Sequence, residues 1–192
     1  MGRLSSPRSP SVRGPRWLGL VALAMWALYL CYKARLGIAG EMLWACHIAT
    51  LGIGFGALLR RYAPVAMGFL FHAGVGVLTN VLDVIANQAL PPMTAASHVV
   101  PVVVGYLAVR GTVWPRWIPL ATLGLCAAVL PVTYLTTDPA LNINVAHTPW
   151  PPLAPWFSSV WTLWLFNVAV GAVLLFGFDA LWRRWPRPAR SG

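Results

Sequence analysis

The groups that could do chemistry in this chain are few: four histidines, three cysteines and four carboxylates among 192 residues. Cys46 and His47 are adjacent, and a cysteine beside a histidine that acts as a general base is a thiol nucleophile suited to acyl transfer or hydrolysis. His98 is a second candidate for that base. The alternative for Cys46 is a small buried hydrophobic side chain.

Metal binding is a separate possibility for the same groups. His47, His98 and His147 offer the nitrogen ligands that metal ions take, and Glu41, Asp83 or Asp138 offers the oxygen ligand. No two histidines have i, i+4 spacing on one helix, and the cysteines have no CxxC spacing. We therefore predict no cofactor, and the alternative for each imidazole is a hydrogen bond to backbone or amide groups.

The most regular polar pattern is a run of six residues separated by four, four, four, three and four positions: Gly68, His72, Gly76, Asn80, Asp83 and Asn87. This spacing predicts one face of a helix. A polar face should point into a bundle, because ionisable and amide groups are costly in contact with lipid. The functional interpretation is a polar cavity, and the alternative is helix packing through the glycines and interhelical hydrogen bonds.

The elements that carry these residues are apolar enough to cross a membrane. Hydrophobic residues make up 58% of the chain and charged residues only 9%, so lipid must cover much of its surface. Because a span needs about 20 apolar residues, we predict an all-α bundle with six transmembrane helices near 17–33, 38–59, 64–87, 95–110, 117–136 and 158–182. Residues 1–16 and 183–192 are predicted to be basic tails, the first one disordered.

The basic residues predict the orientation of the bundle. Twelve of the fourteen lysines and arginines lie in the tails and in the second and fourth connections, and only Lys33 and Arg35 lie in the first connection. By the positive-inside rule, both termini are predicted to be cytoplasmic. The predicted location is the cell membrane, which is the inner membrane in a Gram-negative organism.

This orientation gives three of the four histidines and three of the four carboxylates one common depth, at the extracytoplasmic end of the bundle, and His72 is the histidine outside that group. The candidates for catalysis are Cys46, His47, Asp83 and His98, and those for binding are Glu41, His72, Asn80, Asn142, Asn144 and His147. Asp179, by contrast, lies one turn before Arg183 at the other end and is predicted to be its ion-pair partner.

The net charge of +10 does not predict a nucleic-acid partner, because the basic residues flank apolar runs and form no continuous face. They indicate topology and contacts with anionic lipid headgroups. The expected partner is membrane lipid, and an oligomer is compatible with the sequence. Gly52, Gly54 and Gly56 resemble a phosphate loop only superficially: no strand precedes them, so we predict close helix packing there.

Three stretches of the chain resemble the YwaF-like integral membrane family, to which the plasmalogen-remodelling cysteine acyltransferases look distantly related. The segment from Met42 to Ala49 is similar to a family helix start that reads Leu-Pro-Leu-His-Leu-Cys, with Trp44 in place of the histidine. His98 is similar to a histidine of a later helix. The segment from Asn142 to Val145, followed by Pro149, resembles an Asn-x-Asn-Tyr loop, with valine in place of tyrosine. The resemblance covers about a fifth of the chain. It implies a Cys46 nucleophile, a His98 base, and a loop from Asn142 to His147 that is a lid or contacts a lipid headgroup.

The sequence therefore leaves three hypotheses open. The first is an enzyme that acts on lipid at the outer leaflet by acyl transfer or hydrolysis. The second is a small carrier or channel for a proton, a cation or a polar solute, with the Asp83 face lining a half-pathway. The third is a membrane assembly subunit whose polar residues only hold helices together.

Overall fold

The computed structural model describes residues 11–88 and 91–185, without the side chains of Asp83, Ala86, Asn87 and Pro152. Throughout these ranges the regular elements are helices and there is no strand. The tail residues 1–10 and 186–192 lie outside the described part. The all-helical class predicted from the sequence is confirmed.

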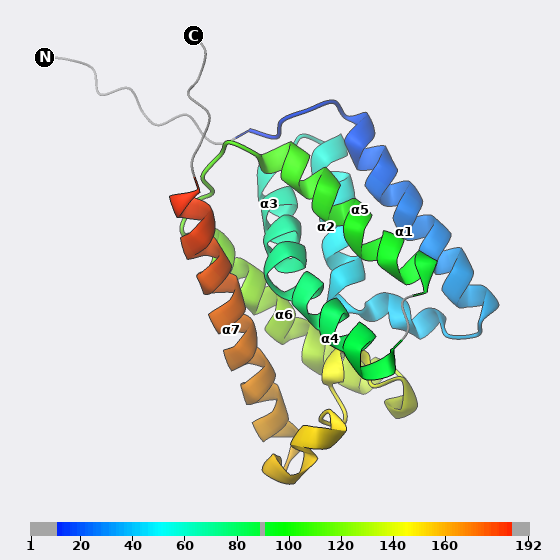
Figure 1. The fold of residues 1–192 in the computed structure, drawn as a ribbon. Helices are drawn as coiled ribbons and strands as arrows, with labels where there is room; N and C mark the ends of the chain where they lie inside the picture. Colours follow the sequence, from blue (N-terminus) through cyan, green and yellow to red (C-terminus); the bar gives the residue numbers. More distant parts are fainter. Residues whose placement is uncertain (1–10, 89–90, 186–192) are drawn as a thin grey trace, which may run out of the picture.

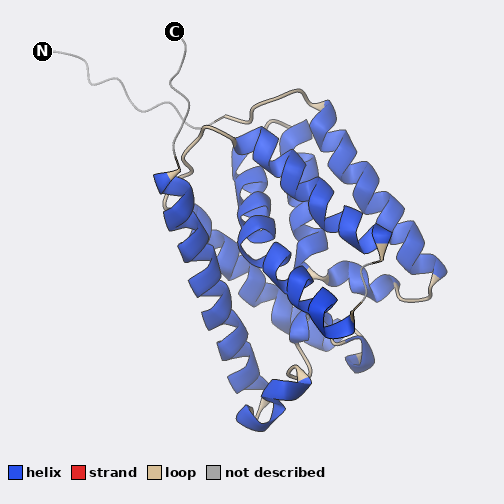
Figure 2. Cartoon of the chain, in the orientation of Figure 1, coloured by secondary structure: helices blue, strands red, loops and turns tan. Residues whose placement is uncertain are grey.

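The helices form one bundle (Figures 1 and 2). The α-helices are α1 (Trp17–Arg35), α2 (Ala45–Leu58), α3 (Tyr62–Phe71), α4 (Val77–Asn87), α5 (Pro92–Val109), α6 (Trp117–Thr136) and α7 (Val160–Arg184). A π-helical segment, η2 (His72–Gly76), joins α3 to α4. The short 3₁₀ helices are η1 (Ala39–Leu43), η3 (Pro139–Leu141), η4 (Ile143–Val145) and η5 (Pro151–Trp156).

Among the residues that the structure describes, five helical runs are long and apolar enough to cross a membrane: 17–35, 62–82, 92–109, 117–136 and 160–184. The remaining predicted span, 38–59, divides at Trp44 into η1 and the 14-residue α2. Because α2 measures only about 21 Å at 1.5 Å per residue, it is shorter than the hydrocarbon core of about 30 Å.

Close approaches at glycine join the first three helices. A Cβ added at Gly19 of α1 would lie 2.5 Å from the Gly54 carbonyl oxygen of α2. A Cβ at Gly68 of α3 would lie 2.5 Å from the Ala49 carbonyl oxygen. The backbones therefore meet where only glycine fits, as in other membrane helix pairs, and the predicted packing role of the α2 glycines is confirmed for Gly54.

α3 is the central helix and packs against α2, α5, α6 and α7. Its side chains Val65, Phe69 and Leu70 belong to the main buried apolar cluster, together with Val109 of α5 and Trp114. Large apolar side chains on the outer helices remain uncovered by protein; Leu135, Leu165 and Val173 are each at least 70% exposed. An apolar surface of this kind requires lipid or another apolar partner.

Both ends of the described chain lie at the same end of the bundle (Figure 1). The Arg13 backbone amide donates to the Ala108 carbonyl near the end of α5 (2.8 Å). The Trp182 indole near the end of α7 donates to the Thr112 carbonyl (3.1 Å) in the connection that follows α5. The ends of the described chain, the α2–α3 turn and the α5–α6 connection therefore share this end, and they hold most of the basic residues that the structure describes.

At this end an ion pair and stacked aromatic rings link α7 to the connection between α5 and α6. The Arg183 Nε donates to the Asp179 carboxylate at 2.8 Å, which confirms the predicted ion pair. The Trp114 indole donates to the same carboxylate, and its ring stacks on Trp182 with centroids 5.1 Å apart. The connection between α5 and α6 is thereby attached to α7.

Candidate functional site

Three of the four histidines meet in the interior of the bundle, each from a different element. The ring centroids of His47 in α2 and His98 in α5 are 6.5 Å apart, and those of His98 and His72 in η2 are 6.2 Å apart. His72 is fully buried, and His47 is nearly so. We call these three residues the histidine cluster. Because ionisable groups inside a membrane bundle are costly, such a cluster marks a candidate functional site.

The orientation of His72 follows from its hydrogen bonds. The Thr50 hydroxyl donates its only proton to the Cys46 carbonyl at 2.9 Å, so its oxygen accepts from His72 Nε2 at 3.0 Å. The proton of the neutral ring is therefore on Nε2, and Nδ1 carries a lone pair. Nδ1 is buried and has no hydrogen-bond partner within the described residues.

His98 has the opposite tautomer. Its Nδ1 lies 2.9 Å from the Thr94 carbonyl oxygen, one turn earlier in α5, and donates to it. Because this nitrogen donates to Thr94, the Asn80 Nδ2 of α4, which lies 3.3 Å away and is also a donor, packs beside it without a hydrogen bond to it. The lone pair of the neutral ring is therefore on Nε2. His72 and His98 each keep one nitrogen able to accept a proton.

The π-helical segment places His72 in the cluster. A π segment is a one-residue expansion of an α-helix and is often found at functional sites. It changes the register of α4 relative to α3, so the face predicted for a continuous α-helix is interrupted after His72. Gly76 follows on the same side: a Cβ added there would lie 3.3 Å from His72 Nδ1. Gly68, His72 and Gly76 are buried as predicted.

Tyr29 connects the cluster to the end of the bundle at which α1 finishes. Its ring centroid is 4.8 Å from that of His47, and the ammonium group of Lys33 lies 5.3 Å from the Tyr29 ring. Lys33 forms an ion pair with Glu41 of η1. The carboxylate of Glu41, which was predicted as a binding residue, therefore neutralises the Lys33 ammonium of the same chain.

Cys46 lies in the first turn of α2 and is half-buried. In the described part of the chain, no hydrogen bond joins the Cys46 thiol to the imidazole of His47 or of His98. His47 packs on Tyr29, and His98 Nδ1 is held by the Thr94 carbonyl.

His147 is not part of the cluster. Its ring stacks on Tyr134 of α6, with centroids 4.9 Å apart, and no contact with the other histidines is found within the described ranges. The predicted metal set of His47, His98 and His147 is therefore not assembled as a group. Among the described side chains, which do not include Asp83, no group of three or more His, Cys, Asp and Glu residues is arranged to hold a metal ion.

Asn142 and Asn144, predicted to bind a ligand, bind this chain's own backbone. The Asn142 Oδ1 accepts from the backbone amides of His147 (3.1 Å) and Thr148 (3.0 Å). The Asn144 Oδ1 accepts from the Ala45 amide at 2.8 Å, and its Nδ2 donates to the Leu43 carbonyl at 3.0 Å. Asn144 therefore caps the start of α2 from a loop about 100 positions away in the sequence.

The remaining candidate, Asp83, lies in α4, and its side chain is outside the described residues. Three polar residues of the site were missed in the sequence: Tyr29, Thr50 and Thr94. For Thr50 a signal was present, because it is a hydroxyl within an apolar helix, one turn after Cys46. Tyr29 and Thr94 gave no such signal, because tyrosine and threonine are common near span ends.

The fold and the site together define an apolar helix bundle of membrane-protein type with an internal histidine cluster. No family model, curated protein or solved structure matches this chain.

Proposed function

We propose that this protein is a small carrier of the cell membrane that moves protons, and that the histidine cluster is its proton-binding site. The observation that carries the proposal is the series of three imidazoles with consecutive centroids 6.5 and 6.2 Å apart. Proton relays in membrane proteins use ionisable side chains that face the bundle interior.

We propose that protons enter at the end of the bundle that carries Lys33 and Glu41. By the positive-inside rule this end is extracytoplasmic, and both termini are cytoplasmic, with α2 as a short sixth crossing. From there a series of neighbouring rings leads into the bundle, in the order Tyr29, His47, His98 and His72. One water between adjacent rings would be enough to pass a proton.

The path ends at His72. Beyond it, the apolar cluster of Val65, Phe69, Leu70 and Val109 fills the bundle. A proton taken up from outside would therefore be held on a ring with a free lone pair until the helices move. The π segment is a natural place for such a movement, because its hydrogen bonds can revert to the α pattern.

The test is proton flux into phosphatidylcholine liposomes that contain purified protein and an internal pH-sensitive dye, under an imposed potential. We expect flux from the wild type and at least a tenfold loss in His72→Gln and His98→Gln. His147→Gln, which changes a histidine outside the cluster, is the matched control and should retain the flux. Wild-type flux equal to that of empty liposomes, or unchanged flux in His72→Gln, would contradict the proposal.

The position of Cys46 favours a second candidate, the lipid enzyme implied by the resemblance to the YwaF-like family. In that reaction a histidine takes the thiol proton, and the Cys46 thiolate attacks a lipid ester carbonyl. The ester C–O bond breaks, a Cys46 thioester forms, and the alcohol leaves with the proton that the histidine returns. Water or an acceptor alcohol then takes the acyl group and releases the thiol. We place it second because no imidazole is hydrogen-bonded to the thiol in the described structure. If the protein is not this enzyme, a thiol-reactive lipid probe should label Cys46→Ser as strongly as it labels the wild type. Cys126→Ser is the control. Selective loss of labelling in Cys46→Ser would favour the enzyme.

A further inference from the structure

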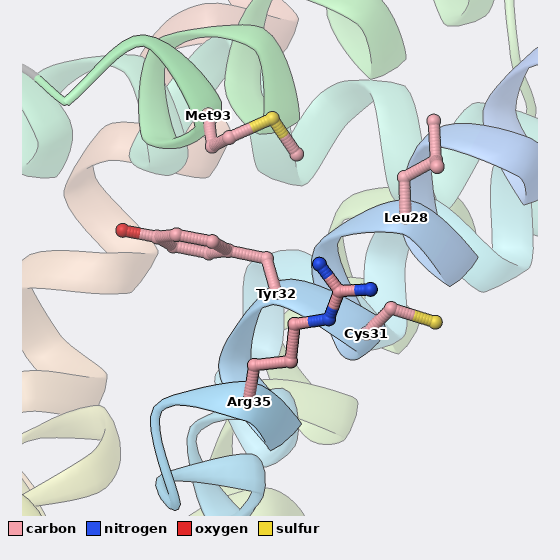
Figure 3. A pocket seen from close by; sticks show the side chains of 5 residues that line it. All are labelled: Leu28, Cys31, Tyr32, Arg35 and Met93. Atoms are coloured by element: carbon pink, nitrogen blue, oxygen red, sulfur yellow. The ribbon is translucent and has the colours of Figure 1, made fainter.

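A groove lies on the outside of the bundle, apart from the histidine cluster, between α1 and the start of α5 (Figure 3). It has a volume of about 220 Å³ and is lined by Leu28, Cys31, Tyr32 and Arg35 of α1 and by Met93 of α5. The four α1 residues are spaced by three, one and three positions and so share one helix face. Most of the lining is apolar, and the Arg35 guanidinium extends across it (Figure 3).

The charge of Arg35 is not compensated within the described structure. Glu41 is paired with the neighbouring Lys33, and the described residues place no carboxylate on Arg35. The guanidinium is a planar fork that binds phosphate through two parallel hydrogen bonds. It lies in the last turn of α1, at the depth where a lipid headgroup meets a helix of this length.

The apolar part of the groove runs back along α1 toward the membrane interior. Leu28 is two turns before Arg35, and its side chain is mostly exposed. The volume is smaller than the 300–1,000 Å³ typical of a site that encloses a whole small molecule. Such a groove would hold one segment of an amphiphile and leave the rest in the bilayer.

These features match the two parts of an anionic phospholipid. We propose that the groove binds one such lipid, with its phosphate on Arg35 and an acyl chain along Leu28, Cys31 and Met93. The bound lipid would join α1 to α5 next to Thr94, whose hydroxyl lies 3.4 Å from the Tyr29 hydroxyl. The proposal does not depend on what the histidine cluster does.

The test is native mass spectrometry of the purified protein released from mixed nanodiscs of phosphatidylglycerol and phosphatidylcholine. We expect the wild type to retain one phosphatidylglycerol in preference to phosphatidylcholine. Arg35→Gln should reduce this retention about tenfold or more, because a charge-assisted hydrogen bond is lost. Leu28→Trp, which fills the apolar part, should also reduce it.

The matched control is Arg110→Gln, which removes an exposed arginine at the other end of the bundle. It should retain the lipid as the wild type does. Equal losses in Arg35→Gln and Arg110→Gln would show diffuse attraction to anionic lipid and would overturn the proposal. Equal retention of the two lipids by the wild type, or a bound protein segment in place of lipid, would overturn it as well. A third variant, Arg35→Lys, keeps the positive charge. Lipid retention by Arg35→Lys would show that a loss in Arg35→Gln comes from the missing charge and not from a loss of folding.

Discussion

Asn144 connects the loop after α6 to the start of α2, the helix that carries Cys46 and His47. Its backbone has φ 56°, in the left-handed region, and its amide makes two hydrogen bonds, to Ala45 and Leu43. Asn144→Gly keeps the backbone conformation, since glycine adopts positive φ freely, and removes only the amide.

We expect Asn144→Gly to lower the melting temperature in detergent by about 4–8 °C, because two hydrogen bonds of about 1 kcal/mol each are lost. Asn167→Ala removes a single hydrogen bond to the Val145 carbonyl of the same loop and should cost about half as much. A larger loss in Asn167→Ala than in Asn144→Gly would mean that Asn144 does not hold α2.

Asp83 stays a prediction from the sequence. It lies on the helix that brings Asn80 to His98, and it is one of four carboxylates in the chain. We expect Asp83→Asn, which is nearly isosteric, to leave membrane insertion and thermal stability intact while abolishing function. Lower stability with unchanged activity per folded molecule would remove Asp83 from the site.

At the scale of elements, the crossing of α2 and α3 depends on Gly68. A Cβ there would lie 2.5 Å from a backbone oxygen of α2, and neither helix can yield by a side-chain movement. We expect Gly68→Ala to lower the melting temperature by about 2–12 °C, because overpacking costs about 1–3 kcal/mol.

Gly124 of α6 is the matched control, because a Cβ there meets nothing within 4 Å. Gly124→Ala should raise the melting temperature by about 1–4 °C, since alanine is the better helix former. Equal effects of the two substitutions would show that the close approach of α2 and α3 does not limit stability.

At the scale of the whole molecule, the proposed orientation predicts the location of every connection. Reporters fused at the N-terminus, after Arg60, after Arg110 and after Arg190 should read as cytoplasmic. Fusions near Gln88 and Ala146 should read as external. A cytoplasmic signal at Gln88 would reject six crossings and would also remove the argument that the histidine cluster opens to the outside.

The sequence by itself determined the helical class, and it determined most helix bounds within a few residues. Long apolar runs ended by proline, polar or basic residues allow little else, because backbone groups in lipid must be satisfied within each segment. The Asp179–Arg183 ion pair was also predictable, since both partners lie on one helix face at i, i+4.

Only the tertiary structure decided which polar residues meet. His47, His72 and His98 come from three elements, and the direction of each ring depends on helix rotation, which local spacing does not contain. At the break of 38–59, the backbone groups on both sides of Trp44 are hydrogen-bonded to an asparagine about 100 positions later, a partner that local sequence does not indicate. The separation of His147 from the other histidines has the same origin: equal depth in a membrane does not determine position around the bundle, which is set by packing between helices.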